Sequence, residues 1–207
     1  MVTSLKQTSS KIAVLSNAFD HSKTETFDDD LILVDKVLSS DHHAFQSLYE
    51  KYYDRVFAIA RGILLDSDEA ADSVQEIFTL VYKNLPRFDR RSKFSTWLFR
   101  IAVNRSIQQA RKLKFKKRQT ELDSFVDSIP DREPSAEHND PRVNEAMIQL
   151  HPNDRAILTL FYWDELSLQE IADSIGCSSN AAKTRLFRAR ERFREIYEKI
   201  PAQEDHS

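Results

Sequence analysis

The chain has very few of the residues that make tight turns. Only 2 of its 207 residues are glycine and 6 are proline, whereas a protein built of hairpin-connected strands needs such residues at most of its turns. Apolar residues instead recur at steps of three and four, which places their side chains on one side of an α-helix. The sequence therefore predicts an all-α protein of long helices.

Helical periodicity divides the chain into two small domains. We expect the first over residues 30–112 and the second over residues 140–200, where Asp140 followed by Pro141 marks a new helix start. Residues 113–139 lose the periodicity and gain Asp, Glu, Ser and Pro, which is typical of a flexible linker. Residues 1–29 are predicted to be a mobile extension and residues 201–207 a short tail.

Several helix ends carry recognisable capping residues. Asp41, Asp66 and Ser167 precede apolar-periodic segments, and the last two are followed three residues later by a glutamate, as in a capping box. Pro86 is expected to end the helix that begins near Asp66. The next helix is expected to run from about Ser95 to Lys112.

Composition excludes several classes of protein. The single cysteine, Cys177, excludes an internal disulfide framework, and one cysteine with scattered histidines predicts neither a metal site nor a cofactor. No apolar run approaches the ~18 residues of a membrane span, and the N-terminus lacks an apolar signal core. We therefore expect a cytoplasmic protein with no membrane insertion.

The net charge of −3 conceals an uneven distribution of charge. Residues 86–118 contain twelve Arg and Lys and one acid, and residues 183–199 contain seven Arg and Lys and three acids. The intervening segment 119–145 contains eight acids and two arginines. Two basic segments separated by an acidic one predict two surfaces that bind a polyanion.

The second basic segment has the pattern of a helix-turn-helix. In SLQEIADSIGCSSNAAKTRLFRARERFRE, a capping box starts one short helix, Gly176 permits a sharp turn, and Ser178 caps a basic helix to about Ile200. Leu186 is assigned to the inner side of this helix. Phe187 is expected either to pack beside the cations or partly to meet a thymine methyl group, and packing is favoured. The residues left toward solvent or DNA are Ser179, Asn180, Lys183, Thr184, Arg185 and Arg188. A helical hairpin with a solvated basic face is the alternative.

The first basic segment combines cations with aromatic residues, as single-stranded nucleic acid requires. Arg100, Asn104, Gln108 and Arg111 follow one another at helical steps and share one face. Trp97 lies on the apolar stripe opposite and is either a core residue or a stacking platform. Phe88, in the basic loop, is less readily explained as core. With the loop cations, the candidate contacts are Phe88, Arg90, Arg91, Lys93, Trp97, Arg100, Asn104, Gln108 and Arg111.

Three motifs in this order resemble bacterial RNA polymerase sigma factors of the extracytoplasmic-function group. They are DSVQEIF from Asp72, FSTWLFRIAVN from Phe94, and the helix-turn-helix ending KTRLFRAR from Lys183. The resemblance covers about residues 30–200. Ala182 departs from it, because the family usually has a larger β-branched residue there.

The resemblance implies a role for each part. The first domain would bind the clamp of core RNA polymerase and open the promoter −10 element through the candidate contacts around the helix from Ser95. The second would read the −35 element with the residues from Ser179 to Arg188 and meet the polymerase flap. A polar stripe would contact the clamp, and its residues are Asp72, Gln75, Glu76 and Thr79. Their spacing alone is explained equally well by an ordinary solvated surface. An anti-sigma protein is a further expected partner.

Two other functions compete with this interpretation. A stand-alone helix-turn-helix regulator would bind DNA without polymerase and would need a dimer interface, for which no heptad pattern is present. An enzyme acting on nucleic acid needs several carboxylates in a basic setting, and Asp89 is alone among the cations of its segment. We therefore expect a non-enzymatic transcription factor.

Overall fold

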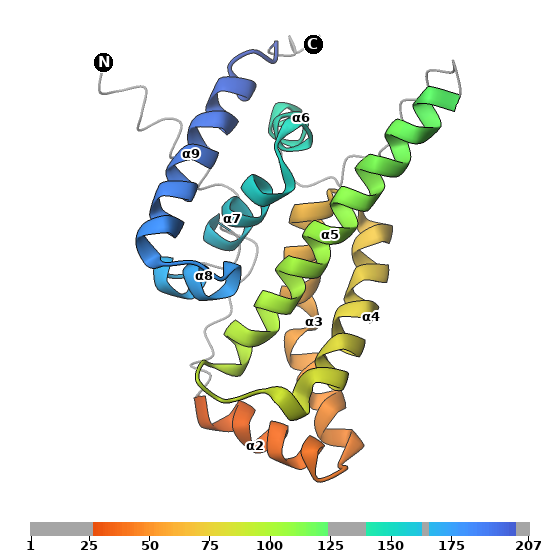
Figure 1. The fold of residues 1–207 in the computed structure, drawn as a ribbon, viewed down its shortest axis with the longest axis vertical. Helices are drawn as coiled ribbons and strands as arrows, with labels where there is room; N and C mark the ends of the chain where they lie inside the picture. Colours follow the sequence, from red (N-terminus) through yellow and green to blue (C-terminus); the bar gives the residue numbers. More distant parts are fainter. Residues whose placement is uncertain (1–26, 124–139, 163–165, 202–207) are drawn as a thin grey trace.

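The computed structural model describes residues 27–123, 140–162 and 166–201, and these residues form eight α-helices and one 3-10 helix without any strand (Figure 1). The predicted all-α fold with a helix-turn-helix in its second half is confirmed. The predicted N-terminal extension up to residue 26, residues 124–139 of the predicted linker, and the tail from residue 202 lie outside the described residues.

The first domain contains α2 (Phe27–Leu38), α3 (His42–Leu64), α4 (Ser67–Asn84), a 3-10 turn (Leu85–Arg87) and α5 (Phe94–Asp123). Asp41 caps α3 by accepting hydrogen bonds from the amides of His43 and Ala44, and Asp66 caps α4 through the amide of Glu69. The carboxylate of Glu69 accepts a hydrogen bond from Gln109 of α5. The capped first turn of α4 is therefore also hydrogen-bonded to α5.

Helix α5 is longer than predicted. It begins at Phe94, where the Trp97 amide donates to the Lys93 carbonyl, and it continues to Asp123 instead of ending near Lys112. The loss of apolar periodicity predicts that residues 113–123 belong to the linker. These residues are mostly Lys, Arg, Leu, Gln and Glu, which favour helix. The lost periodicity marks the point where the helix leaves the core, and the helix itself does not end there.

The second domain contains α6 (Pro141–Gln149), α7 (Pro152–Tyr162), α8 (Leu168–Ile175) and α9 (Ser179–Tyr197). The capping box of Ser167 and Glu170 is complete, and Ser178 caps α9 through the Ala181 amide. Gly176 ends α8 at a φ of 67°, a left-handed conformation that glycine adopts without strain. The predicted helix-turn-helix geometry is confirmed.

The start of α6 is bound to the end of α9. The Tyr197 hydroxyl donates to the Asp140 carboxylate at 2.5 Å, and the Arg142 guanidinium both pairs with Asp140 and lies 4.7 Å from the centre of the Tyr197 ring. A hydrogen bond from Arg142 lowers the pKa of Asp140, and burial opposes this only in part. The cluster closes the second domain at the end opposite the turn.

The two domains pack against each other (Figure 1). Their buried apolar side chains form one continuous core. Helix α7 lies against α3 and α5, and α8 lies against α5. At this junction a Cβ atom on Gly62 would be only 2.5 Å from the Thr159 Oγ1. A glycine inside a helix costs about 1 kcal/mol relative to alanine, and the close approach of α7 is a physical reason for glycine at this position of α3.

None of the helices in the described part of the chain is long and apolar enough to span a membrane. Within the same residues, no group of His, Cys, Asp and Glu side chains has an arrangement suited to a metal ion.

Candidate nucleic-acid interface

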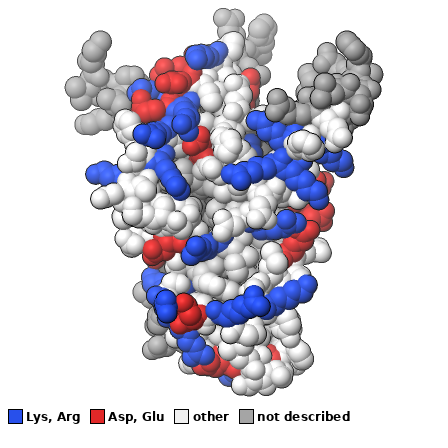
Figure 2. All heavy atoms as spheres, in the orientation of Figure 1, with Lys and Arg blue, Asp and Glu red and all other residues white. Residues whose placement is uncertain are grey.

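One side of α5 carries an exposed polar stripe. Arg100, Asn104, Gln108 and Arg111 are all exposed, whereas Leu98 and neighbouring apolar side chains of the helix are buried. Lys and Arg side chains gather over this helix on the face shown in Figure 2. The donors of the stripe are guanidinium and amide groups, which suit phosphates and base edges.

Phe88 is predicted to be available for contact with DNA, but in the structure it is buried. Only 7% of its surface is exposed, and its ring lies against Phe94 at 5.9 Å and Trp97 at 5.2 Å between centroids. The basic loop folds this aromatic residue inward because Phe94 and Trp97 offer an apolar surface at the start of α5. Trp97 itself is partly buried and packs on the core while keeping some exposed surface.

The loop cations have partners within the chain. Arg90, at a φ of 60°, pairs with Asp35 of α2, and Arg91 pairs with Asp89 at 3.3 Å. Lys93 reaches the second domain, where its ammonium donates to Glu170 of α8 at 3.1 Å. These cations are therefore partly neutralised in the arrangement described.

The second domain contacts the polar stripe of α5 at two further points. The Arg111 guanidinium donates to the Asn153 side chain at 3.3 Å, and a Cβ atom on Gly176 would be 3.1 Å from a terminal nitrogen of Arg100. Burial raises the pKa of Glu170, but hydrogen bonds from Ser167 and Lys93 outweigh it and leave this pKa below its ordinary value. The second domain thus lies along the stripe that we expected to meet DNA.

The candidate DNA-binding face of α9 is free of such contacts. Asn180, Lys183, Thr184, Arg185 and Arg188 are exposed, and Ser179 is half-buried. Among the described residues, the side chains of Lys183, Arg185 and Arg188 have no hydrogen-bond or ion-pair partner. Ala182, with Leu186, is buried and packs in the core, so the small residue at this position still belongs to the inner face.

The later cations of α9 hold the domain together. Arg190 lies over the Phe161 ring at 4.5 Å, and Arg192 pairs with Asp154 of α7 at 2.7 Å. Phe187, in contrast, is 63% exposed. The favoured prediction that it packs is therefore not met, and the alternative, contact with a thymine methyl group, stays a prediction. Phe187 lies four residues after Lys183, on the outer side of the helix. Its position relative to the buried Leu186 was the sequence signal that we missed.

The predicted polar stripe on α4 is exposed along its whole length: Asp72, Gln75, Glu76 and Thr79. Glu76 of this stripe is held in place, because the Arg105 guanidinium of α5 donates to its carboxylate at 2.6 Å. Sequence reasoning missed two apolar neighbours on this helix, Leu80 and Tyr82, which are 36% and 45% exposed. The exposed side of α4 is therefore mixed in character and not purely polar.

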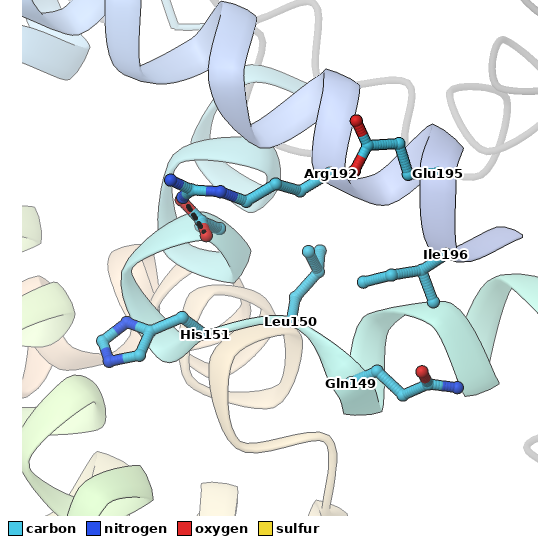
Figure 3. Close-up of a pocket in the computed structure, with 7 residues that line it drawn as sticks. Gln149, Leu150, His151, Arg192, Glu195 and Ile196 are labelled. Carbon is cyan, nitrogen blue, oxygen red and sulfur yellow. Dashed lines mark hydrogen bonds and ion pairs between the residues drawn. The ribbon is translucent and has the colours of Figure 1, made fainter.

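A pocket in the second domain lies between the α6–α7 junction and the end of α9 (Figure 3). Leu150 and Ile196 give it an apolar part, and Arg192 and Glu195 bring charges of both signs. It is at the opposite end of α9 from the first turn of the helix, so it is separate from the candidate DNA-binding face.

The architecture defines a two-domain DNA-binding protein whose second domain is a helix-turn-helix. Family models match both domains: Sigma-70 region 2 over residues 48–116 and Sigma-70 region 4 over residues 142–193. The ECF RNA polymerase sigma factor SigW of Bacillus subtilis is 31% identical over 176 residues, which cover 78% of this chain and 92% of that protein. The ECF RNA polymerase sigma-E factor of Escherichia coli K12 is 32% identical, covering 78% and 91%.

Solved structures share the fold. The structure of CnrH in complex with the cytosolic domain of CnrY has a TM-score of 0.62 at 24% identity and covers 83% of this chain and 99% of that chain. The sigma factor RpoE of Bartonella quintana, in complex with the anti-sigma factor NepR, has a TM-score of 0.57 at 24% identity and covers 76% and 98%.

The chain belongs to the sigma-70 family of RNA polymerase sigma factors, in the extracytoplasmic-function group. It is a transcription initiation factor that directs RNA polymerase to promoters. Sigma factors are non-enzymatic transcription factors.

Proposed function

We propose that the two domains divide promoter recognition between them. Helix α5 and the loop before it open the −10 element, and the first turns of α9 read the −35 element in the major groove. The observation that carries this division is the presence of two exposed donor-rich faces on separate domains, each backed by a buried apolar side. Trp97, which retains exposed surface, takes the place of the buried Phe88 as the aromatic contact.

The test is transcription and permanganate footprinting with reconstituted holoenzyme. Arg100→Ala with Asn104→Ala is expected to reduce melting of the −10 element and to leave core binding unchanged, because both side chains are exposed and neither lies in the core. Lys36→Gln, on an exposed residue of α2, is the control. Normal melting by the double variant would contradict the assignment.

Core polymerase is proposed to bind the exposed side of α4, with Asp72 and Gln75 facing basic residues of the clamp. Asp72→Arg is the sharpest test, because Glu76 also bridges to Arg105 and its replacement would disturb the α4–α5 contact. Asp54→Arg, on an exposed position of α3, is the control. Co-purification with core should fail for the first variant alone, and circular dichroism should be unchanged for both.

The polymerase flap is proposed to meet the second domain at the pocket of Figure 3. The pocket is separate from the DNA-binding turns of α9, and Ile148, next to its lining residue Gln149, is 44% exposed. Ile148→Asp is expected to weaken transcription from promoters that need the −35 element. The same variant should keep its core affinity, which the clamp dominates.

We also propose that the protein works in the cytoplasm and is held by an anti-sigma protein. Support comes from the solved RpoE–NepR complex, whose sigma factor shares this fold. Co-expression of the tagged chain with candidate regulators, followed by a transcription assay, tests this partner. The regulator should block transcription by holoenzyme in a dose-dependent way.

The DNA-binding face of α9 is open in the chain by itself, so dependence of DNA binding on core polymerase is the property that distinguishes a sigma factor from a stand-alone regulator. A gel-shift assay separates the two functions. A sigma factor should bind promoter DNA tightly only with core polymerase, whereas a regulator should bind equally well without it.

A further inference from the structure

One member of the polar stripe on α4, Glu76, is held by a second helix. Its carboxylate oxygen Oε2 accepts hydrogen bonds from both Nε, at 2.6 Å, and Nη2 of Arg105 on α5. Thr79 instead donates to the Gln75 carbonyl of its own helix at 2.8 Å. Among the described residues, the side chains of Asp72 and Gln75 have no hydrogen-bond partner. The position of the Glu76 carboxylate is therefore set before any partner binds.

The hydrogen bonds to Glu76 leave one of its two carboxylate oxygens open. Both oxygens of a carboxylate accept hydrogen bonds, and in the described part of the chain no donor reaches Oε1 of Glu76. The Glu76 side chain is 54% exposed. A donor that approaches the exposed side of α4 therefore meets an acceptor oxygen that is both accessible and already oriented.

Arg105 is itself well fixed between the two helices. Its side chain is only 24% exposed, and the planar guanidinium directs its N–H donors along set directions, which orients the carboxylate that receives them. One turn further along α5, Gln109 donates to Glu69 of α4 at 2.9 Å. Of these two contacts between α4 and α5, the one made by Arg105 reaches a residue of the stripe.

We propose that Arg105 is a positioning residue for core RNA polymerase, which holds Glu76 so that its open oxygen accepts a hydrogen bond from a cationic or amide donor of the clamp. This rests on the proposed function, which places the clamp on the exposed side of α4. Ordering a long side chain at an interface lowers affinity, and a side chain that is already ordered in the free protein avoids that loss. If Arg105 instead only neutralised Glu76, it would oppose the binding of a cation, so the two roles predict effects of opposite sign.

The experiment measures the affinity of the full chain for core polymerase by fluorescence titration. Arg105→Gln releases the Glu76 side chain and at the same time removes a positive charge beside it. We expect the affinity to fall by about 2-fold to 12-fold, the cost of ordering one long side chain on binding. The loss should persist at raised salt, where attraction between exposed charges is screened. In a chain that carries Glu76→Gln, the same substitution should cause no further loss, because Arg105 acts through Glu76.

Gln109→Ala is the matched control, because it removes the neighbouring α4–α5 contact without touching a residue of the stripe. It should keep the wild-type affinity for core, whereas Arg105→Lys, which retains a donor for Glu76, should recover part of the affinity that Arg105→Gln loses. Unchanged or tighter core binding by Arg105→Gln, an equal loss with Gln109→Ala, or a further loss in the Glu76→Gln chain would overturn the proposal. Retention of core by Asp72→Arg would instead overturn the proposed function.

Discussion

The two candidate DNA-binding helices, α5 and α9, have similar charge but differ in how the rest of the chain treats them. Along α5, Arg111 donates to Asn153, Arg100 lies against Gly176, and Lys93 pairs with Glu170 in the loop before it. On α9, the side chains of Lys183, Arg185 and Arg188 have no comparable partner among the described residues. Similar sequence patterns thus give one exposed surface that the second domain contacts at a few points and one exposed surface that it does not contact.

Simultaneous binding of both promoter elements, as proposed, would require this arrangement to change. A compact chain of 207 residues has a radius of gyration of about 17 Å, which corresponds to a sphere of about 43 Å in diameter. Two elements centred roughly 25 base pairs apart are separated by about 85 Å at 3.4 Å per base pair. We therefore expect the domains to separate when both elements are bound.

The largest effect is expected on the open surface. Each arginine that reads a base is worth about 1–3 kcal/mol of discrimination, or about 5-fold to 150-fold. Transcription by holoenzymes carrying Lys183→Ala, Arg185→Ala or Arg188→Ala should be measured on a set of −35 variants. At least one substitution should change the order of the promoters. Arg194→Ala, at a residue paired with Glu191, is the control; uniform reduction by all three would mean that α9 anchors without reading sequence.

The next effect should come from Gly62, at the junction of the domains. Gly62→Ala favours the helix by about 1 kcal/mol but forces a Cβ against Thr159, and overpacking of this kind costs about 1–3 kcal/mol. Hydrogen exchange should rise at α7 and α8 while α3 stays protected. Thr159→Ala in the same chain removes both side-chain atoms nearest the new Cβ and should restore protection. Unchanged exchange in the single variant would mean that the junction adapts without opening.

A smaller effect is expected from the pair that links the basic loop to α8. Lys93 and Glu170 are partly exposed, and such a pair contributes about 0–1 kcal/mol. Glu170→Gln also weakens the cap of α8, so Lys93→Gln is the cleaner change. It should slightly raise exchange at the junction, and this increment should vanish at high salt.

The smallest effect is a dependence on pH. The pKa of Glu170 is below its ordinary value of 4.5 because hydrogen bonds from Ser167 and Lys93 outweigh burial. Its contribution to stability is therefore full above that value and is lost as the pH falls through the lowered pKa. Hydrogen exchange at α8 should be measured at neutral and at acidic pH in both chains. The increase on acidification should be larger in wild type than in Glu170→Gln. An identical acid response in both chains would remove Glu170 from this role.

The sequence predicted helices and caps well because these depend on neighbours in the chain. Asp41, Ser167, Gly176 and Ser178 act within one turn of helix, so their roles follow from local spacing. The docking of α7 on α3 depends on residues far apart, such as Gly62 and Thr159, and no local pattern predicts it.

The errors in the candidate site have the same origin. Phe88 was taken as accessible because its neighbours in the sequence are basic, but Phe94 and Trp97 bury its ring. For Phe187 the sequence favours packing over contact with a thymine methyl group, whereas the structure leaves its side chain exposed, one helical position after the buried Leu186. Exposure within a basic segment depends on the direction of each side chain, which composition does not specify.

The most direct test of the account is the distance between the two domains before and after promoter binding. Labels on Asp54→Cys and Lys199→Cys, both exposed positions, in a chain with Cys177→Ser, report this distance by pulsed electron spin resonance. The free chain should give one distance within the roughly 43 Å diameter of a compact chain, and the holoenzyme–promoter complex a clearly longer one. The same short distance in both states would contradict the account, because a closed chain cannot reach both promoter elements.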